Sequence, residues 1–547
     1  MQKSYLYEIF KQTLNQLNIP NDIDLFFETP NNPDHGDLAT NIAMKSAKYL
    51  KKKPRDIAEE IVKLLQYDND KIEKIDIAGP GFINIKFSDK YYFKAVAELI
   101  AKGKNIGKQD SGKGKKVNVE YVSVNPTGLL HLGHGRNACI GDTVANLYEW
   151  LGYEVVREYY FNNAGNQMNK LADSIYARYI QIYFDDQYQF PESGYHGSYV
   201  KEIAKDLYNE KKDELKAGTK DDILYCRKFG EKWCFQKIRK TLERLDIKQD
   251  VFYNEESLYE EGKIDDLLNK LQEKNLVYEK EDAKWLKLSK LGLEQDRVIV
   301  KSSGEPTYRL PDIAYHIEKF KRDFDKIIDV FGSDHIATVP DVLATVDALG
   351  YDKEKVDVLI HQFVTLTEDG KQVKMSKRTG RSYTLDDLLD EVGADIVRYF
   401  LIMRSISTHL EFDLNLAKEQ SEKNPVFYLQ YAHARINSIF RKLEESGKKK
   451  NLNPDFSKLI SEYEINLIKQ LLNFEETIQN SARKYEPQIL AEYLKETASM
   501  FHIFYHNCPI LQADNETMSA RLSLAEITKN TIHNGLTILG ISAPEKM

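Results

Sequence analysis

The sequence is short of cysteine. Its 547 residues contain four, and no two of them have the CxxC spacing of a zinc or redox site: Cys139, Cys226, Cys234 and Cys508. This spacing excludes a small disulfide-bonded framework and argues against a structural metal site. We therefore expect reduced thiols, as in the cytoplasm.

Long apolar runs are also absent. No stretch approaches the roughly 18 consecutive apolar residues that a membrane-spanning helix requires. Residues 1–17 have the period of an amphipathic helix and lack the short apolar core of a secretion signal. The sequence therefore predicts a cytoplasmic protein that does not interact with a membrane.

An excess of positive charge is missing too. Lys and Arg number 77 against 85 Asp and Glu, which gives a formal net charge of −8. A nucleic-acid partner is not excluded, because phosphate contacts depend on local patches rather than on the total charge. The basic stretches 113–116 and 441–450 are candidate patches, although such stretches are more often solvated loops. Charge alone therefore does not predict the partner.

The sequence does contain the motif HLGHGR at 131–136, at the junction of a strand and a helix. Residues 116–122 alternate like a strand, 125–128 break the pattern, and 138–151 have helical period before a second strand at 154–161. In such a β-α-β unit the end of the strand and the start of the helix form an anion site. His131 and His134 lie there, but two capping or core histidines would explain this motif about as well.

A second motif, KMSKR at 374–378, lies in a charged stretch between Gly370 and Gly380, which predicts an exposed loop. By itself it is typical of a solvated basic turn. Transfer from ATP, however, relies on positioning and on cations placed where charge develops. A lysine-bearing loop that closes over departing pyrophosphate meets that need. Together the two motifs predict a site that binds a polyphosphate and forms an adenylate.

The two motifs, with their separation and their β-α-β context, resemble those of class I aminoacyl-tRNA synthetases. Further segments narrow the resemblance to the arginyl-tRNA synthetase family and cover nearly the whole chain: DHGDLATN at 34–41, AGPGFIN at 78–84, VEYVSVNP at 119–126, YHGSY at 195–199, DIAYH at 312–316, GSDH at 332–335, NPVFYLQYAHAR at 424–435, and LGI and APEKM within 539–547.

The resemblance implies an α/β fold with a Rossmann-type, parallel-sheet catalytic domain that carries an insertion. It also implies an α+β N-terminal domain that contacts tRNA and an all-α C-terminal helical bundle that binds the anticodon. Periodicity and turn residues place these domains at 1–107, 115–385 with a helical insertion at about 172–250, and 386–547. We expect the core sheet to resume through 285–286 and 298–300, and no strand after 385.

The activity implied by the resemblance is that of an arginine–tRNA ligase. ATP and L-arginine would form arginyl-adenylate and pyrophosphate, and the arginyl group would pass to the 3′-terminal adenosine of tRNA(Arg). The expected cofactors are ATP and Mg²⁺ carried by ATP, without a protein-bound structural metal. The expected partners are tRNA(Arg), L-arginine and ATP, and the expected state is a monomer.

The residue roles carried over from the family motifs fall into four groups. The expected catalytic residues are His131, His134, Lys374 and Lys377. The expected ATP-binding residues are His131, Gly133, His134, Lys374, Met375, Ser376 and Lys377. The expected arginine-binding residues are Glu120, Ser123, Asn125, His131, Tyr308, Asp312 and His335. For tRNA we expect Tyr431 and Arg435, which share a helix face suited to unstacked bases.

The chemistry of arginine fits the predicted pocket. A guanidinium group is planar, permanently charged and bidentate, so its site needs fixed carboxylates and aromatic walls. Tyr308 and Asp312 are four residues apart, although Asp312 beside Pro311 also reads as a helix N-cap. A site built for such polar pairing can discriminate by roughly 10⁴–10⁵, so we expect no editing site.

Two positions depart from the family pattern. Many members carry a lysine just before the first histidine motif and lack the second lysine of the loop motif. Here the upstream position is Gly128 and the loop retains Lys377, so we expect Lys377 to supply the cation near the α-phosphate. The other departure is His335, where some relatives use glutamine.

Two alternative functions fit the sequence less well. Another class I synthetase, such as the cysteine enzyme, would bring thiol and histidine metal ligands, which the cysteine spacing argues against. A catalytically silent RNA-binding relative would have lost the histidines or the lysines, and both sets are present.

Overall fold

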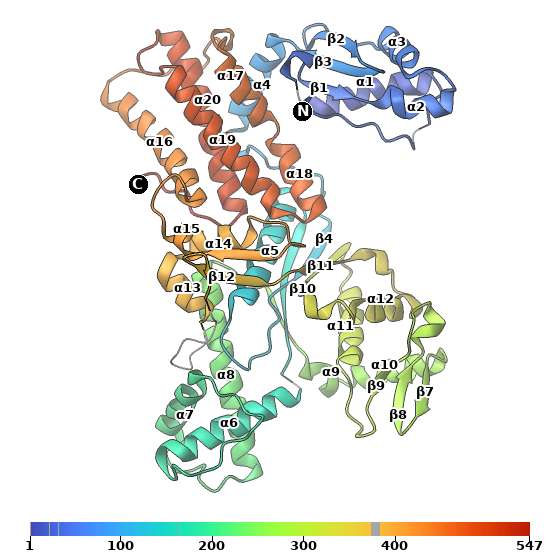
Figure 1. Ribbon diagram of the computed structural model, residues 1–547, viewed down its shortest axis with the longest axis vertical. Helices are drawn as coiled ribbons and strands as arrows, with labels where there is room; N and C mark the ends of the chain where they lie inside the picture. Colours follow the sequence, from blue (N-terminus) through green and yellow to red (C-terminus); the bar gives the residue numbers. More distant parts are fainter. Residues whose placement is uncertain (1, 21, 31, 164, 374–382) are drawn as a thin grey trace.

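The computed structural model describes residues 2–20, 22–30, 32–163, 165–373 and 383–547. Figure 1 shows an elongated molecule with a parallel sheet at its middle. A small N-terminal domain and a helical bundle lie at one end, and two separate lobes lie at the other.

The N-terminal domain packs helices against a small antiparallel sheet with the strand order β1-β3-β2. β2 and β3 pair as an antiparallel hairpin, and Gly79 and Gly81 of its turn have φ of +52° and +137°, which glycine adopts readily. The elements are α1 (Gln2–Gln16), β1 (Leu38–Thr40), α2 (Ile42–Leu50), α3 (Pro54–Leu64), β2 (Ile72–Ala78), β3 (Phe82–Phe87) and α4 (Asp89–Lys102).

The central sheet has five parallel strands in the order β11-β10-β4-β5-β6. The predicted β-α-β unit is confirmed, because α5 follows β4 and leads to β5, which pairs with β4 in parallel. The carboxyl ends of the strands therefore meet at one edge, where ligands bind in such sheets. The elements are β4 (Lys116–Glu120), α5 (Leu132–Trp150), β5 (Glu154–Phe161), β6 (Val251–Asn254), β10 (Lys326–Gly332) and β11 (Val356–His361).

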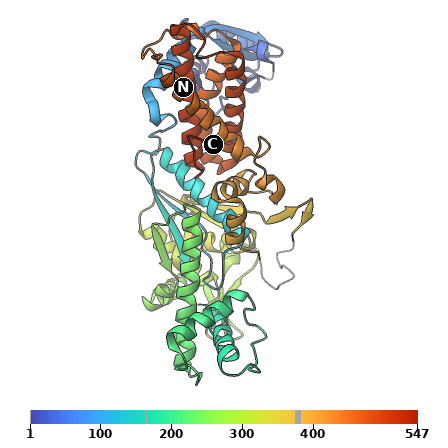
Figure 2. The same ribbon diagram turned by 90° about the vertical axis from the view of Figure 1, so that its left-hand side faces the viewer.

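A helical lobe interrupts the sheet between β5 and β6. It consists of α6 (Asn166–Tyr183), α7 (Ser198–Lys211) and α8 (Lys220–Arg244), so its first helix begins before the predicted start. The long α8 runs from this lobe back toward the sheet (Figure 2). There Arg244 pairs with Asp386 and Asp390, at 2.6 Å each.

In the second lobe, the prediction that the core sheet resumes through 285–286 and 298–300 is wrong. Residues 285–286 and 298–300 belong to a separate antiparallel sheet, β7-β8-β9, and not to the central sheet. A short apolar strand has the same pattern in either sheet, so periodicity could not assign it. The lobe and its connections comprise α9 (Glu256–Glu260), α10 (Lys263–Glu273), β7 (Val277–Lys280), β8 (Ala283–Leu286), β9 (Arg297–Val300), α11 (Arg309–Lys321) and α12 (Val339–Ala348).

The C-terminal part is a helical bundle, but the prediction of no strand after residue 385 is wrong. β14 (Leu410–Asp413) pairs in parallel with β12 (Val364–Glu368), which also pairs with β13 (Lys371–Gln372). A four-residue strand between helices leaves little periodic signal. The helices are α13 (Leu385–Val392), α14 (Ala394–Ile402), α15 (Leu414–Lys418), α16 (Pro425–Glu445), α17 (Glu462–Leu472), α18 (Phe474–Lys484), α19 (Pro487–Asn507) and α20 (Asn515–Ile538).

One apolar core runs from the N-terminal domain through the sheet into the bundle, and the two lobes have cores of their own. Among the described residues, no helix combines the length and the apolar character that crossing a membrane requires.

Candidate active site

His131 and His134 form the N-terminal cap of α5. Nδ1 of His131 accepts hydrogen bonds from the backbone N–H groups of Gly133 (3.1 Å) and His134 (3.4 Å). Nδ1 of His134 accepts one from the backbone N–H of His131 at 3.3 Å, and the two rings stack with centroids 3.4 Å apart. The structure therefore confirms that the two histidines cap the helix, which the sequence had left open.

Capping leaves the Nε2 edge of each ring to donate. Because Nδ1 is the acceptor in both rings, each neutral imidazole carries its proton on Nε2. Burial lowers the pKa of His131, and it lowers the pKa of His134 to about 3, so both rings are neutral at pH 7. Two N–H donors at a helix N-terminus complement phosphate oxygens, so capping and anion binding are compatible roles.

The described segment that begins at residue 383, after the second motif, lies next to the first motif. Lys374, Met375, Ser376 and Lys377 themselves lie outside the described residues. After the motif, the backbone N–H of Leu385 donates to the carbonyl oxygen of Leu130 at 2.8 Å, directly before His131. A Cβ at Gly135 would meet Leu385 Cδ1 at 2.8 Å, so glycine permits the close packing of α5 against this segment.

The bend between β4 and α5 carries three of the predicted arginine-binding residues. Glu120 is buried, and one of its carboxylate oxygens accepts a hydrogen bond from Ser123 Oγ at 2.9 Å. The other oxygen is paired with the fully buried Lys319, which also pairs with Asp329. Asn125 follows and donates from Nδ2 to Gln167 at 2.8 Å.

Asp312 lies in the first turn of α11 and does not cap it. Tyr308 holds the cap position without a capping hydrogen bond, so the N-cap interpretation of Asp312 is wrong. Burial raises the pKa of Asp312 to about 7, and Glu255 pushes it in the same direction. Asp312 has no ion-pair partner among the described residues, and Tyr308, one turn earlier, is 59% exposed.

Glu255 is a further carboxylate beside the half-buried Asp312, and the sequence patterns did not single it out. It is 3% exposed, accepts a hydrogen bond from the hydroxyl of Tyr160 at 2.7 Å, and burial raises its pKa to about 7. Its position directly after the strand β6, at the carboxyl edge of a parallel sheet, is the signal that could have identified it. Within the described parts of the chain, Glu255 and Asp312 both lack a cationic partner, so together they suit a ligand with several N–H donors.

Two further histidines lie at the same edge of the sheet. His335, a predicted arginine-binding residue, ends the 3₁₀ turn η4 (Ser333–His335) after β10 and stacks on Phe331 with centroids 5.0 Å apart. No hydrogen bond or ion pair among the described residues joins His335 to Asp312 or Glu120. His361, which the sequence analysis did not identify, ends β11, and burial lowers its pKa to about 4.

Tyr431 and Arg435 lie on one face of α16, as their spacing predicts. The guanidinium of Arg435 lies 5.7 Å from the ring centroid of Tyr431 and 4.8 Å from that of Tyr505 in α19. Tyr431 also stacks with Phe427 at 6.3 Å and with His502 at 6.1 Å. Both predicted residues are half-buried, so each retains some accessible surface.

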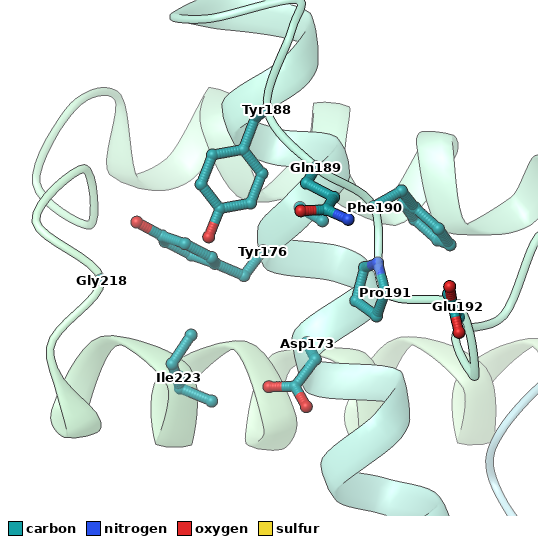
Figure 3. Close-up of a pocket in the computed structure, with 10 residues that line it drawn as sticks. Asp173, Tyr176, Tyr188, Gln189, Phe190, Pro191, Glu192, Gly218 and Ile223 are labelled. Carbon is teal, nitrogen blue, oxygen red and sulfur yellow. The ribbon is translucent and has the colours of Figure 1, made fainter.

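A cavity of about 550 Å³ lies away from these residues, in the helical lobe (Figure 3). Asp173 and Tyr176 of α6 line it together with a segment that includes Tyr188, Gln189 and Glu192. Its lining contains carboxylates but no lysine or arginine, which makes it unsuited to a polyphosphate. None of the predicted site residues contributes to it.

No group of three or more His, Cys, Asp or Glu side chains is placed to hold a metal ion in the described parts of the chain. A carboxyl-edge site with two neutral histidines at a helix N-terminus and with the carboxylates of Glu255 and Asp312 suits a positively charged amino acid beside a polyphosphate.

Three family models together match most of the chain. Residues 4–87 match the arginyl tRNA synthetase N terminal domain, and residues 95–402 match the catalytic domain of tRNA synthetases class I (R). Residues 429–547 match the DALR anticodon binding domain.

Individual proteins agree with these matches. The chain is 47% identical to the arginine--tRNA ligase of Salinibacter ruber over 563 residues, which covers 100% of both chains. It is 47% identical to the arginine--tRNA ligase of Desulfotalea psychrophila, covering 95% of this chain and 94% of the relative. The structure of Thermus thermophilus arginyl-tRNA synthetase superposes with a TM-score of 0.81 over 100% of both chains at 22% identity, which shows the shared fold.

Proposed function

The chain belongs to the arginyl-tRNA synthetase family, and from this membership we propose how its residues carry out the family's reaction. It catalyses the arginine–tRNA ligase reaction of class I. L-Arginine and ATP form arginyl-adenylate and pyrophosphate, and the arginyl group is then transferred to the 3′-terminal adenosine of tRNA(Arg).

Asp312 and Glu255 bind the guanidinium group of the substrate. The observation that carries this assignment is a pair of carboxylates, Glu255 buried and Asp312 half-buried, both with a pKa raised to about 7 and neither in an ion pair among the described residues. A buried carboxylate without a counter-ion is costly, and a guanidinium supplies both charge and paired N–H donors. Tyr308 provides an aromatic wall, and a lysine ammonium would leave part of this set underpaired.

The bend after β4 binds the other end of arginine. Glu120 faces the substrate α-amino group, while Ser123 and Asn125 orient its amino and carboxylate groups together with His131. His335, at the end of the neighbouring strand, also lines the amino-acid pocket. Burial raises the pKa of Glu120, and the adjacent Lys319 ammonium opposes this shift, because a nearby cation favours the charged carboxylate.

ATP lies with its phosphates at the N-terminus of α5. His131 and His134 donate from Nε2 to phosphate oxygens, and the missing side chain of Gly133 allows close approach. Mg²⁺ accompanies the nucleotide, since this ion binds substrate phosphates and retains several waters. Lys374, Met375, Ser376 and Lys377 contact the triphosphate from the loop motif, and the two lysines neutralise the leaving pyrophosphate.

Two bond exchanges complete the reaction. A carboxylate oxygen of arginine attacks the α-phosphorus, and the bond from that phosphorus to the bridging oxygen breaks, so pyrophosphate leaves. The 2′-hydroxyl of the terminal adenosine then attacks the arginyl carbonyl carbon, and AMP leaves with the electron pair of the broken bond. The hydroxyl proton is released in this second step.

The domains divide the recognition of tRNA. Residues 1–107 contact the body of tRNA(Arg), residues 115–385 with the helical insertion catalyse, and residues 386–547 bind the anticodon through Tyr431 and Arg435. We further propose that the protein works in the cytoplasm as a monomer without a membrane partner, which light scattering and cell fractionation would test.

Arginine-dependent ATP–pyrophosphate exchange, run with and without tRNA(Arg), tests the assignment. We expect exchange with arginine and none with lysine, glutamine or cysteine, and a loss of about 100-fold or more in kcat/KM for arginine in Asp312→Asn. Asp173→Asn is the matched control, because this carboxylate lines the cavity of the helical lobe, away from the predicted site residues. Folded wild-type protein that catalyses no exchange, with or without tRNA, would contradict the catalytic assignment and favour a silent RNA-binding relative.

A further inference from the structure

The bend between β4 and α5 contains two consecutive residues in the left-handed backbone region. Val122 has φ of +70° and Ser123 has φ of +44°. A β-branched residue rarely adopts such a φ, because its side chain crowds the backbone. Strain of this size shifts a local equilibrium by roughly five- to 150-fold, so surrounding contacts must hold Val122 in place.

Asn137, in the first half of α5, supplies one such contact. Its Oδ1 accepts a hydrogen bond from the backbone N–H of Val122 at 2.6 Å, and its Nδ2 donates to the carbonyl oxygen of Val330 at 2.7 Å. The paired register of β4 and β10 ends at Glu120 and Asp329. The Asn137 amide therefore bridges the backbone segments that follow β4 and β10, just beyond the last paired residues of these two strands.

The orientation of this amide is determined by its partners. Val122 offers a donor and Val330 an acceptor, so Oδ1 and Nδ2 cannot be exchanged. Nδ2 also lies 3.3 Å from Nε2 of His361, whose Nδ1 faces the carbonyl oxygen of Gln362. Because burial lowers the pKa of His361 to about 4, its ring is neutral and Nε2 accepts. Asn137 is 6% exposed and all its donors and acceptors are used.

The strained bend contains and precedes residues that we propose bind arginine. Ser123 Oγ donates to Glu120 at 2.9 Å and accepts from the backbone N–H of Tyr160 at 3.0 Å. A Val122 that relaxed to negative φ would rotate the following peptide and move Ser123 away from both partners.

We propose that Asn137 is a positioning residue for arginine binding: its amide oxygen holds Val122 in the left-handed conformation that presents Ser123 and Asn125 to the substrate. This inference rests on the proposed function, and it assigns to α5 a second role besides binding ATP phosphates. Asn137 touches neither substrate and acts through the backbone of Val122.

Steady-state ATP–pyrophosphate exchange with the full chain and tRNA(Arg) tests the proposal, with arginine and ATP varied separately. Asn137→Ala should raise KM for arginine about tenfold or more and leave KM for ATP within about twofold. Asn146→Ala is the matched control, because Asn146 lies on the same helix but bonds to the carbonyl oxygen of Ile538 and to Arg157. It should leave both constants unchanged.

A rescue experiment separates positioning from a general structural role. Glycine adopts positive φ without strain, so Val122→Gly combined with Asn137→Ala should restore most of the arginine KM, although it restores none of the lost hydrogen bonds. Asn137→Asp keeps the acceptor for Val122 and should retain an arginine KM within about threefold of wild type, while its second oxygen faces Val330 and lowers the melting temperature.

Each outcome decides the proposal. An unchanged arginine KM in folded Asn137→Ala, or a raised KM that Val122→Gly does not restore, overturns it. Should Asn137→Ala fail to fold, a tenfold rise in the arginine KM of Asn137→Asp would overturn it instead. If the wild-type protein catalyses no ATP–pyrophosphate exchange, the proposed function itself is rejected. The comparison of variants with wild type tests only the role of Asn137.

Discussion

The guanidinium of Arg398 donates from Nη2 to Oδ2 of Asp142, and this buried ion pair joins α14 to α5. Arg398 also donates to the carbonyl oxygens of Leu245 at 2.8 Å and Leu539 at 3.0 Å. One side chain thereby connects the histidine-bearing helix, the end of the helical lobe and the C-terminal segment. Gly540 has φ of +69°, and a Cβ there would lie 1.9 Å from Nη2, so glycine is required beside Arg398.

Removal of Arg398 should strongly destabilise the protein. Arg398→Met would remove the nearer guanidinium partner of the buried Asp142 and leave only Arg157, whose Nε lies 3.8 Å away. Breaking a buried pair costs about 3–5 kcal/mol, and denaturant unfolding monitored by circular dichroism would measure this loss. Arg55→Ala is the control, because Arg55 and Glu59 form an exposed pair on α3 whose loss should cost no more than about 0.5 kcal/mol. Equal stability of the two variants would show that Arg398 does not organise the fold.

Arginine binding should strengthen as the pH rises from 6 to 8. Asp312 and Glu255 have pKa values raised to about 7, and only their ionised forms attract a guanidinium. Each carboxyl should therefore contribute about a tenfold change in affinity over this range, measured by calorimetric titration of arginine. The histidines do not account for the change, since burial keeps His131 and His134 neutral.

In the protein without bound arginine, the same two carboxyls give the free energy of unfolding the opposite pH dependence. Unfolded carboxyls lose their protons near pH 4, while Asp312 and Glu255 retain theirs to about pH 7. The folded state binds more protons between these values, so the stability contributed by these groups is present below about pH 4 and falls as the pH rises to about 7. Asp312→Asn should weaken the pH dependence of arginine affinity and that of stability. An unaltered pH profile of arginine affinity would exclude Asp312 from the pocket.

Loss of Lys377 should be the harsher of the two lysine losses in the loop motif. The position upstream of the histidine motif is Gly128, so we expect Lys377 to supply the cation near the α-phosphate. Lys377→Ala should reduce adenylation at least about tenfold, measured as single-turnover pyrophosphate release. Lys371→Ala, on the exposed strand β13, is the control and should have little effect. A smaller loss in Lys377→Ala would contradict this compensation.

Tyr431 and Arg435 should affect tRNA and not the small substrates. Stacking of an unpaired base on an aromatic ring contributes about 1–3 kcal/mol, so Tyr431→Ala should raise KM for tRNA(Arg) about five- to 150-fold in aminoacylation assays. Arg435→Ala should also reduce the salt dependence of tRNA binding if it contacts a phosphate. Tyr49→Ala, at an exposed position on α2, is the control for loss of a surface aromatic. Unchanged tRNA binding would place the anticodon elsewhere on the bundle.

Sequence patterns predicted the parts of the site that local chemistry dictates. The strand, the turn at 125–128 and the helical period located His131 and His134 at the start of α5, where their capping geometry arises within four residues. Motif spacing also indicated the family. The same reasoning assigned β8 and β9 to the wrong sheet and overlooked β14, because short strands have similar patterns whichever neighbour they pair with.

By itself, then, the sequence determined the family, the β-α-β unit around the first histidine motif and the helical C-terminal part, because these depend on residue type, periodicity and spacing along the chain. Only the tertiary structure decided which carboxylates have no ion-pair partner within the part of the chain that it describes. Asp312 and Glu255 come from different elements, and burial raises the pKa of both. It likewise decided that Asn137 meets the strained Val122, since that contact depends on how α5 packs across the sheet edge.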